Sequence, residues 1–265
     1  MNTLMLVRES CPAGFSAMSG VLGAIVGSFL GLVADRVPAM VMDEESRTNL
    51  LFPGSHCPAC GHSLKAWENI PLVSWLALRG RCSHCHTAIP LRLFLIECAT
   101  ALFFAVSAWC IADIQALCAL WLMAAFLLPL TLIDRQHLLL PDCLTQPLLW
   151  AGLLIHAFSG SLPLRDALCG AVAGYLSLWL LYWGFRLATG REGLGYGDFK
   201  LLAALGAWCG WQALPSIVLI AALSGILGYF LMTKSDKNNL VISFGPYLSF
   251  AGIAVFISQL LVIQI

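Results

Sequence analysis

The sequence predicts an all-α, multi-pass integral membrane protein of about eight transmembrane helices, with one small polar insert after the first helix. Hydrophobic residues make up 60% of the 265 residues and charged residues only 11%, whereas a soluble domain carries about 25% charged residues. The mean hydropathy is +0.86. Long apolar runs recur along the chain, and about 20 such residues span a bilayer as a helix.

The apolar runs give the approximate place of each helix. We expect helices near residues 13–34, 93–112, 114–133, 144–160, 167–189, 199–213, 214–232 and 245–264. The chain then divides into three parts. These are an N-terminal segment with the first helix (1–35), a polar insert (36–92) and a helical membrane domain (93–265).

The basic residues predict the orientation, because cytoplasmic loops are enriched in Lys and Arg. If the N-terminus lies outside, all of the 14 Lys and Arg residues except Arg8 and Arg165 fall on the cytoplasmic side. The polar insert is then cytoplasmic. The formal net charge is zero, which gives no indication of nucleic acid or another polyanion as a partner.

The polar insert contains two CxxC pairs, in CPACGH (57–62) and CSHCHT (82–87). Two such turns can present four thiolates to one tetrahedral zinc ion, although the spacing here is slightly longer than usual. Redox disulfides are the alternative, and the reducing cytosol disfavours them. We therefore expect a structural zinc site that holds a small domain together. Its ligands would be Cys57, Cys60, Cys82 and Cys85.

Two aspartates far apart in the sequence fall at the same membrane face. Asp134 lies at the cytoplasmic end of the third expected helix, and Asp198 begins the sixth. Asp198 alone is explained by helix capping. Asp134 is not, because a negative charge at a helix C-terminus opposes the dipole and an intramembrane carboxylate is a functional candidate by default. Asp142 follows Leu-Pro and has an ordinary turn or cap interpretation.

The stretch GLGYGDFK (193–200) places three alternating glycines before Asp198. We expect these glycines to allow positive φ and the close approach of another backbone. A phosphate-binding loop is the alternative, but no strand precedes it and the GxGxxG spacing is absent. Lys200 is rotated by about 200° from Asp198 on a helix, so we expect it to reach the lipid headgroups. The loop that supports the pair would comprise Gly195, Gly197, Lys200 and Asp142.

At these residues the sequence resembles the type IV prepilin leader peptidases, which are intramembrane aspartic proteases with a GxGD motif. The matching elements occur in the family's order and cover about residues 23 to 250. They are the two cysteine pairs, NIPLVSWLALRGRC (69–82), residues 92–97, IDRQHLLLPD (133–142), GYGDFK (195–200) and SFGPYL (243–248).

The resemblance implies that Asp134 and Asp198 are the catalytic pair. It implies removal of the short basic leader of prepilins or pseudopilins at the cytoplasmic face of the bacterial inner membrane. It also implies methylation of the new N-terminal amine with S-adenosylmethionine, for which no stretch here is a recognisable nucleotide loop. Glu68, Glu97 and the acidic residues 43–45 are candidates for contact with a basic leader.

In a pair of carboxylates, one would act as the base and the other as the acid, because ionising both carboxylates of a shared site costs too much free energy. Helix position favours ionised Asp198 as the base and protonated Asp134 as the acid, although such a pair titrates as a unit. The alternatives are a general GxGD intramembrane protease, a zinc-containing membrane transporter and a non-enzymatic scaffold of a secretion machine. A transport site would require polar residues at the middle of the membrane, where this sequence is almost free of charge.

Overall fold

The computed structural model describes residues 5, 8–42, 49–191, 193–233 and 243–263. The described residues form helices and loops without a β-sheet, so the expected all-α class is confirmed. The long helices are α2 (Pro12–Met42), α4 (Leu91–Cys110), α5 (Ile114–His137), α6 (Asp142–Ser159), α7 (Leu164–Thr189), α8 (Tyr196–Cys209), α9 (Leu214–Thr233) and α10 (Gly245–Ile263). The short elements are η1 (Ala66–Asn69), α3 (Val73–Ala77) and η2 (Trp211–Ala213).

Each expected helix has a counterpart, but two of the eight are weak candidates for a membrane span. In the described residues, 6 helices are long and apolar enough to cross a membrane, namely α2, α4, α5, α7, α9 together with η2, and α10. Helix α8 has only 14 residues, and α6 is less apolar because it includes Asp142, Gln146 and His156. The chain is therefore a multi-pass membrane protein in which α6 and α8 differ from the other long helices.

The chain forms two compact units, residues 1–118 and 119–265. In the first unit, α2 packs along α4 through glycines spaced four residues apart. A Cβ atom at Gly23 would lie 2.6 Å from the Thr100 carbonyl oxygen, and one at Gly27 would overlap the Thr100 side chain. Small residues of this kind let helix backbones approach closely in membranes. Helix α2 continues to Met42, beyond the expected end near residue 34.

In the second unit, α8 is enclosed by α6, α7 and α10, and its residues from Asp198 to Cys209 are buried except Lys200. Gly170 of α7 and Gly206 of α8 meet backbone to backbone, where a Cβ atom on either would overlap the other helix. A helix that is apolar on all sides belongs in a core. Helix α8 ends at Cys209, before the expected residue 213, because Gly210 turns the chain with φ +80°.

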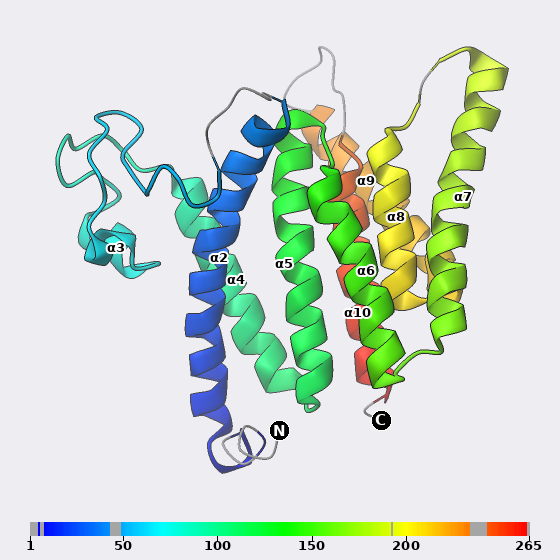
Figure 1. The fold of residues 1–265 in the computed structure, drawn as a ribbon, viewed down its shortest axis with the longest axis horizontal. Coiled ribbons are helices and arrows are strands. Elements are labelled where there is room, and N and C mark those ends of the chain that lie inside the picture. The colour runs from blue at the N-terminus through cyan, green and yellow to red at the C-terminus, as the bar shows by residue number, and fades with distance from the viewer. Residues whose placement is uncertain (1–4, 6–7, 43–48, 192, 234–242, 264–265) are drawn as a thin grey trace. The chain divides into compact units, whose positions relative to one another are not determined.

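Consecutive helices of the second unit run in alternating directions (Figure 1). The end of α5 and the starts of α6, α8 and α10 consequently gather at one end of this bundle. The loops between these helices are short, as in 138–141 between α5 and α6. Asp134, in the last turn of α5, and Asp142 and Asp198, in the first turns of α6 and α8, all lie at that end.

Candidate functional site

Asp134 lies in the last turn of α5 and is only 5% exposed. The backbone N–H of Gly245, the first residue of α10, donates a hydrogen bond of 2.9 Å to Asp134 Oδ2. Helix N-termini carry unpaired N–H groups that favour such a partner. The carboxylate is therefore buried in the bundle end and fixed by α10.

Asp198 lies in the first turn of α8 and is 8% exposed. The charge of Asp134 acts electrostatically on Asp198, so the two carboxylates belong to one electrostatic site. Two carboxylates in such proximity favour a state in which they share one proton. The structure thus brings the two sequence-predicted aspartates to the same end of the bundle.

The helix-dipole assignment of acid and base is not supported by this geometry. The sequence places Asp134 only at the C-terminus of its own helix, but the structure also places its carboxylate at the N-terminus of α10. Asp198 lies at the N-terminus of α8. Because both carboxylates are near a helix N-terminus, the dipoles do not distinguish them. Since Asp134 Oδ2 accepts the Gly245 N–H, a proton on Asp134 would sit on Oδ1.

The expectation of positive φ in the glycine stretch is wrong, because Gly195 has φ −82° and the described glycines with positive φ lie elsewhere. The close approach is made by a side chain instead of a backbone. A Cβ atom at Gly197 would lie 2.8 Å from the Leu140 Cβ. Gly197 therefore lets the segment 138–141, which follows Asp134, pack against the start of α8.

Lys200 forms an ion pair that the sequence did not predict. Its Nζ lies 2.6 Å from Asp142 Oδ1 and 2.8 Å from Oδ2. The sequence argument that Lys200 faces away from Asp198 agrees with this pairing, but it could not supply the partner, which belongs to another helix. Asp142 is the first residue of α6, so the ion pair joins the starts of α6 and α8.

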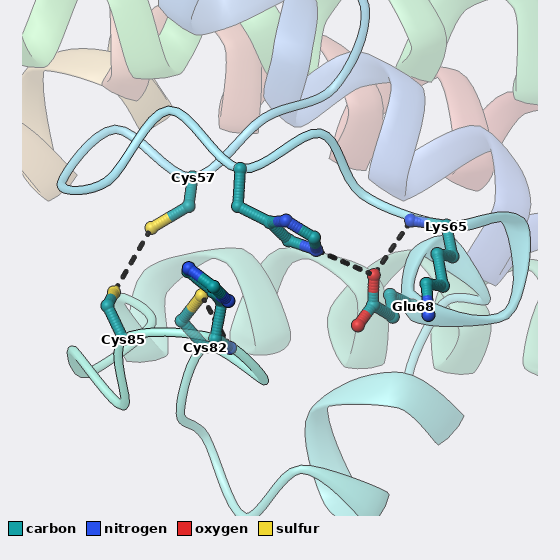
Figure 2. Close-up of polar contacts among 7 residues, drawn as sticks. Cys57, Lys65, Glu68, Cys82 and Cys85 are labelled. Carbon is teal, nitrogen blue, oxygen red and sulfur yellow. Dashed lines mark hydrogen bonds and ion pairs between the residues drawn. The ribbon is translucent and has the colours of Figure 1, made fainter.

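The four cysteines of the insert converge as expected for a metal site. Their Sγ atoms lie within 4.8 Å of one another, and those of Cys57 and Cys85 are 3.8 Å apart. Two sulfurs bound to one tetrahedral zinc at about 2.3 Å would be separated by about 3.8 Å. Figure 2 shows Cys57, Cys82 and Cys85 facing a common point. The cluster therefore fits a zinc ion held by Cys57, Cys60, Cys82 and Cys85.

The two cysteine loops have the same backbone geometry. In the first, the N–H of Gly61 bonds the Cys57 carbonyl, and in the second the N–H of His86 bonds the Cys82 carbonyl. Both donor residues have positive φ, +70° and +58°. The hydroxyl of Thr87, 3.2 Å from Cys85 Sγ, lowers the pKa of that thiol to about 6. This favours the thiolate of Cys85, the form that binds a metal, whereas burial and the hydrogen bonds of the neighbouring thiols raise the pKa of Cys60 to about 12.

Glu68 joins the two cysteine loops. It is 6% exposed, its Oε2 accepts a 2.7 Å hydrogen bond from the Lys65 N–H, and its Oε2 lies 3.9 Å from His62 Nε2 (Figure 2). A hydrogen bond from the Ser83 side chain, and then the Lys65 N–H, hold the pKa of Glu68 below its usual range. Glu68 is thus a buried structural carboxylate and a poor candidate for leader contact. Residues 43–45 lie outside the described residues.

Comparison with known proteins identifies the family. Residues 21–111 match the bacterial peptidase A24 N-terminal domain, and residues 121–230 match the type IV leader peptidase family. The chain belongs to the type IV leader peptidase family. No solved structure matches the chain.

Curated relatives of this leader peptidase family cover nearly the whole chain. A Pseudomonas putida protein is 47% identical over 91% of this chain and 90% of its own length. A Pectobacterium carotovorum protein is 46% identical over 96% of each chain, and an Aeromonas salmonicida protein is 44% identical over 95% of this chain and 94% of its own. All three are named prepilin leader peptidase/N-methyltransferase.

The sequence alone does not assign a role to one residue that contacts Asp134. In the sequence, SFGPYL is only an element of the family resemblance, yet its Gly245 contacts Asp134 directly. A Cβ atom at this glycine would lie 2.5 Å from Asp134 Oδ2. The signal that could have found it is a Gly-Pro pair at the start of a helix, because Pro favours the first turn, where the N–H groups have no partner within the helix.

Proposed function

We propose that the chain is a membrane aspartic peptidase. It removes the leader peptide of prepilins or pseudopilins at the cytoplasmic face of the bacterial inner membrane and then methylates the new N-terminal residue. The observation that carries the proposal is the pair of buried carboxylates, Asp134 and Asp198, at one end of the bundle in a chain of this family. The relatives' printed names support both activities. They favour this function over a general GxGD protease or a transporter.

The aspartate pair would cleave the peptide bond by acid and base catalysis. The ionised carboxylate takes a proton from a water molecule that attacks the scissile carbonyl, and the protonated one donates a hydrogen bond to the carbonyl oxygen. Gly245 holds Oδ2 of Asp134, so its Oδ1 is the oxygen that faces the reaction. Because one proton must be present and one absent, we expect the rate to fall at both low and high pH.

The zinc ion and the methyl donor would have separate roles. Zinc with four cysteine ligands has no open position for catalysis, so the cysteine cluster would stabilise the insert. S-adenosylmethionine would supply an electrophilic methyl group on a sulfonium. The chain's partners would thus be the lipid bilayer and a prepilin or pseudopilin with a basic leader, with the active end of the bundle toward the cytoplasm.

The test is cleavage of a prepilin by the purified protein in detergent, with mass spectrometry to record leader loss and methyl addition separately. Asp134→Asn and Asp198→Asn should each lower the cleavage rate by about 10² to 10⁴ or more. Asp166→Asn is the matched control and should cleave like wild type, because Asp166 lies in the first turn of α7, at the opposite end of the bundle. Substantial cleavage by either active-end variant would refute the aspartate pair.

A further inference from the structure

A cavity of about 480 Å³ lies between α2, α4 and the cysteine insert of the first unit. This volume is within the range of small-molecule sites, about 300 to 1,000 Å³. The wall is largely apolar and aromatic, and it includes the rings of Trp75 and Phe94, which stack with centroids 4.4 Å apart. The aspartate pair does not use this cavity, since both aspartates belong to the second unit.

The charged groups of the wall are predominantly acidic. Its carboxylates are Asp35, Glu68 and Glu97, and its guanidinium groups are Arg36 and Arg92. The cavity therefore carries a net negative charge and attracts a cation. A wall with net negative charge is a poor site for free phosphate or a nucleoside triphosphate.

Most of these charges already have partners. Arg92 is paired with Asp35, and the Arg36 guanidinium donates to the carbonyls of Asn49 and Pro53. Glu68 is held within the insert, as described above.

Glu97 differs from the other acidic residues of the wall. Its Oε2 accepts a 2.8 Å hydrogen bond from the Leu72 N–H. In the part of the chain that the structure describes, its Oε1 has no hydrogen-bond or ion-pair partner. Glu97 thus offers an oxygen to a ligand.

Trp75 provides a second incomplete group in the wall. Its Nε1 is buried and has no hydrogen-bond partner among the described residues. A buried N–H without a partner is costly, and native proteins seldom leave one so. The aromatic face of the same ring attracts a positive charge.

We propose that this cavity is the binding site for S-adenosylmethionine, with Trp75 and Phe94 as its aromatic wall and Glu97 as the carboxylate that faces the ligand's positive charge. The ligand has the required features: a sulfonium and an ammonium, ring and ribose acceptors, and a net positive charge. The inference rests on the methyl-transfer part of the proposed function. In that reaction the neutral amine forms an N–C bond to the methyl group as the C–S bond breaks, S-adenosylhomocysteine leaves, and the amine's proton passes to solvent.

The experiment compares two ligands that differ in charge. S-adenosylhomocysteine has the same adenosyl and amino acid groups but lacks the sulfonium. Binding of each is measured by isothermal titration calorimetry to the full-length zinc-loaded protein in detergent. Glu97→Gln keeps an acceptor for the Leu72 N–H and removes only the charge. The variant should weaken the binding of S-adenosylmethionine at least tenfold and the binding of S-adenosylhomocysteine less than threefold.

A second variant and a control separate binding from folding. Trp75→Phe removes the indole N–H and part of the aromatic wall, so it should weaken the binding of both ligands at least fivefold. Trp67→Phe is the control, because Trp67 also belongs to the insert, is 48% exposed and does not line the cavity. It should bind both ligands as wild type does. Zinc content and melting temperature show whether each variant is folded.

The outcomes distinguish this inference from the function on which it rests. If wild type binds neither ligand, the methyl-transfer part of the proposed function fails, and this inference fails with it. If wild type binds but Glu97→Gln and Trp75→Phe bind equally well, the donor site lies elsewhere and methyl transfer stands. Equal weakening of both ligands by Glu97→Gln would also overturn the assigned role, because a loss of structure does not discriminate by charge.

Discussion

At the scale of single residues, the informative contact is between Asp134 and a backbone amide 111 positions further along the chain. A carboxylate that accepts one fixed hydrogen bond has a defined orientation, which acid-base catalysis requires. Gly245 supplies this bond and also leaves the space next to it free, since any Cβ there would lie 2.5 Å from Oδ2. The backbone N–H of Gly245 and the absence of a side chain on this residue act together to position Asp134.

Gly245→Ala tests this positioning. The added methyl group must displace the Asp134 carboxylate or the start of α10, and a misplacement of about 1 Å costs about 10² in rate. We expect kcat for leader cleavage to fall by about 10² with little change in KM. Gly184→Ala in α7 is the control, because no described atom beyond its own stretch of helix lies within 4 Å of its Cβ position. A wild-type kcat for Gly245→Ala would refute the positioning role.

The residue-level chemistry could be predicted from the sequence only in part. The cysteine cluster was predictable, because the two CxxC turns carry their own local geometry. The common position of the two aspartates at one end of the bundle was predictable from the places of the apolar runs. The partners of Asp134 and Lys200 were not, because Gly245 and Asp142 lie on other helices and helical periodicity gives directions on one helix only.

At the scale of elements, the starts of α6 and α8 are joined by the Lys200–Asp142 ion pair and by the packing of Leu140 against Gly197. The two contacts bracket Asp198 in the first turn of α8. The side chains of Lys200 and Asp142 are 33% and 61% exposed. Exposed pairs contribute only about 0 to 1 kcal/mol to stability. The pair therefore acts mainly on the alignment of α8.

A double-mutant cycle of Lys200→Met and Asp142→Asn tests this alignment. Each single change removes the same interaction, so we expect each to lower the cleavage rate several-fold and the double variant to be no slower than the slower single one. The melting temperature should change little, in line with the small stability of an exposed pair. Cleavage rates and melting curves of the four proteins give the result. Additive losses in rate would show that the two residues act separately.

At the scale of the whole molecule, the alternation of helix directions explains why distant carboxylates meet. Short loops force consecutive helices to be antiparallel, so the end of α5 and the start of α8 fall at the same end of their bundle (Figure 1). The direction of each helix could be predicted by counting the apolar runs along the sequence. The shortness of α8 could not, since its end depends on Gly210, which interrupts an otherwise continuous apolar stretch. Helix α8 can be as short as 14 residues because other helices of the bundle surround it.

The same alternation predicts which loops face the cytoplasm, because basic residues gather at one end. We expect a cysteine at Thr189, at the end of α7, to react with a membrane-impermeant maleimide in inside-out vesicles but not in intact spheroplasts. A cysteine at Ser161, between α6 and α7, should show the reverse. Both are introduced after replacement of the exposed cysteines other than the zinc ligand Cys60, namely Cys11, Cys110, Cys118, Cys143 and Cys169. If both sites react from one side, α7 does not cross the membrane, and the proposed cytoplasmic position of the aspartate pair loses its basis.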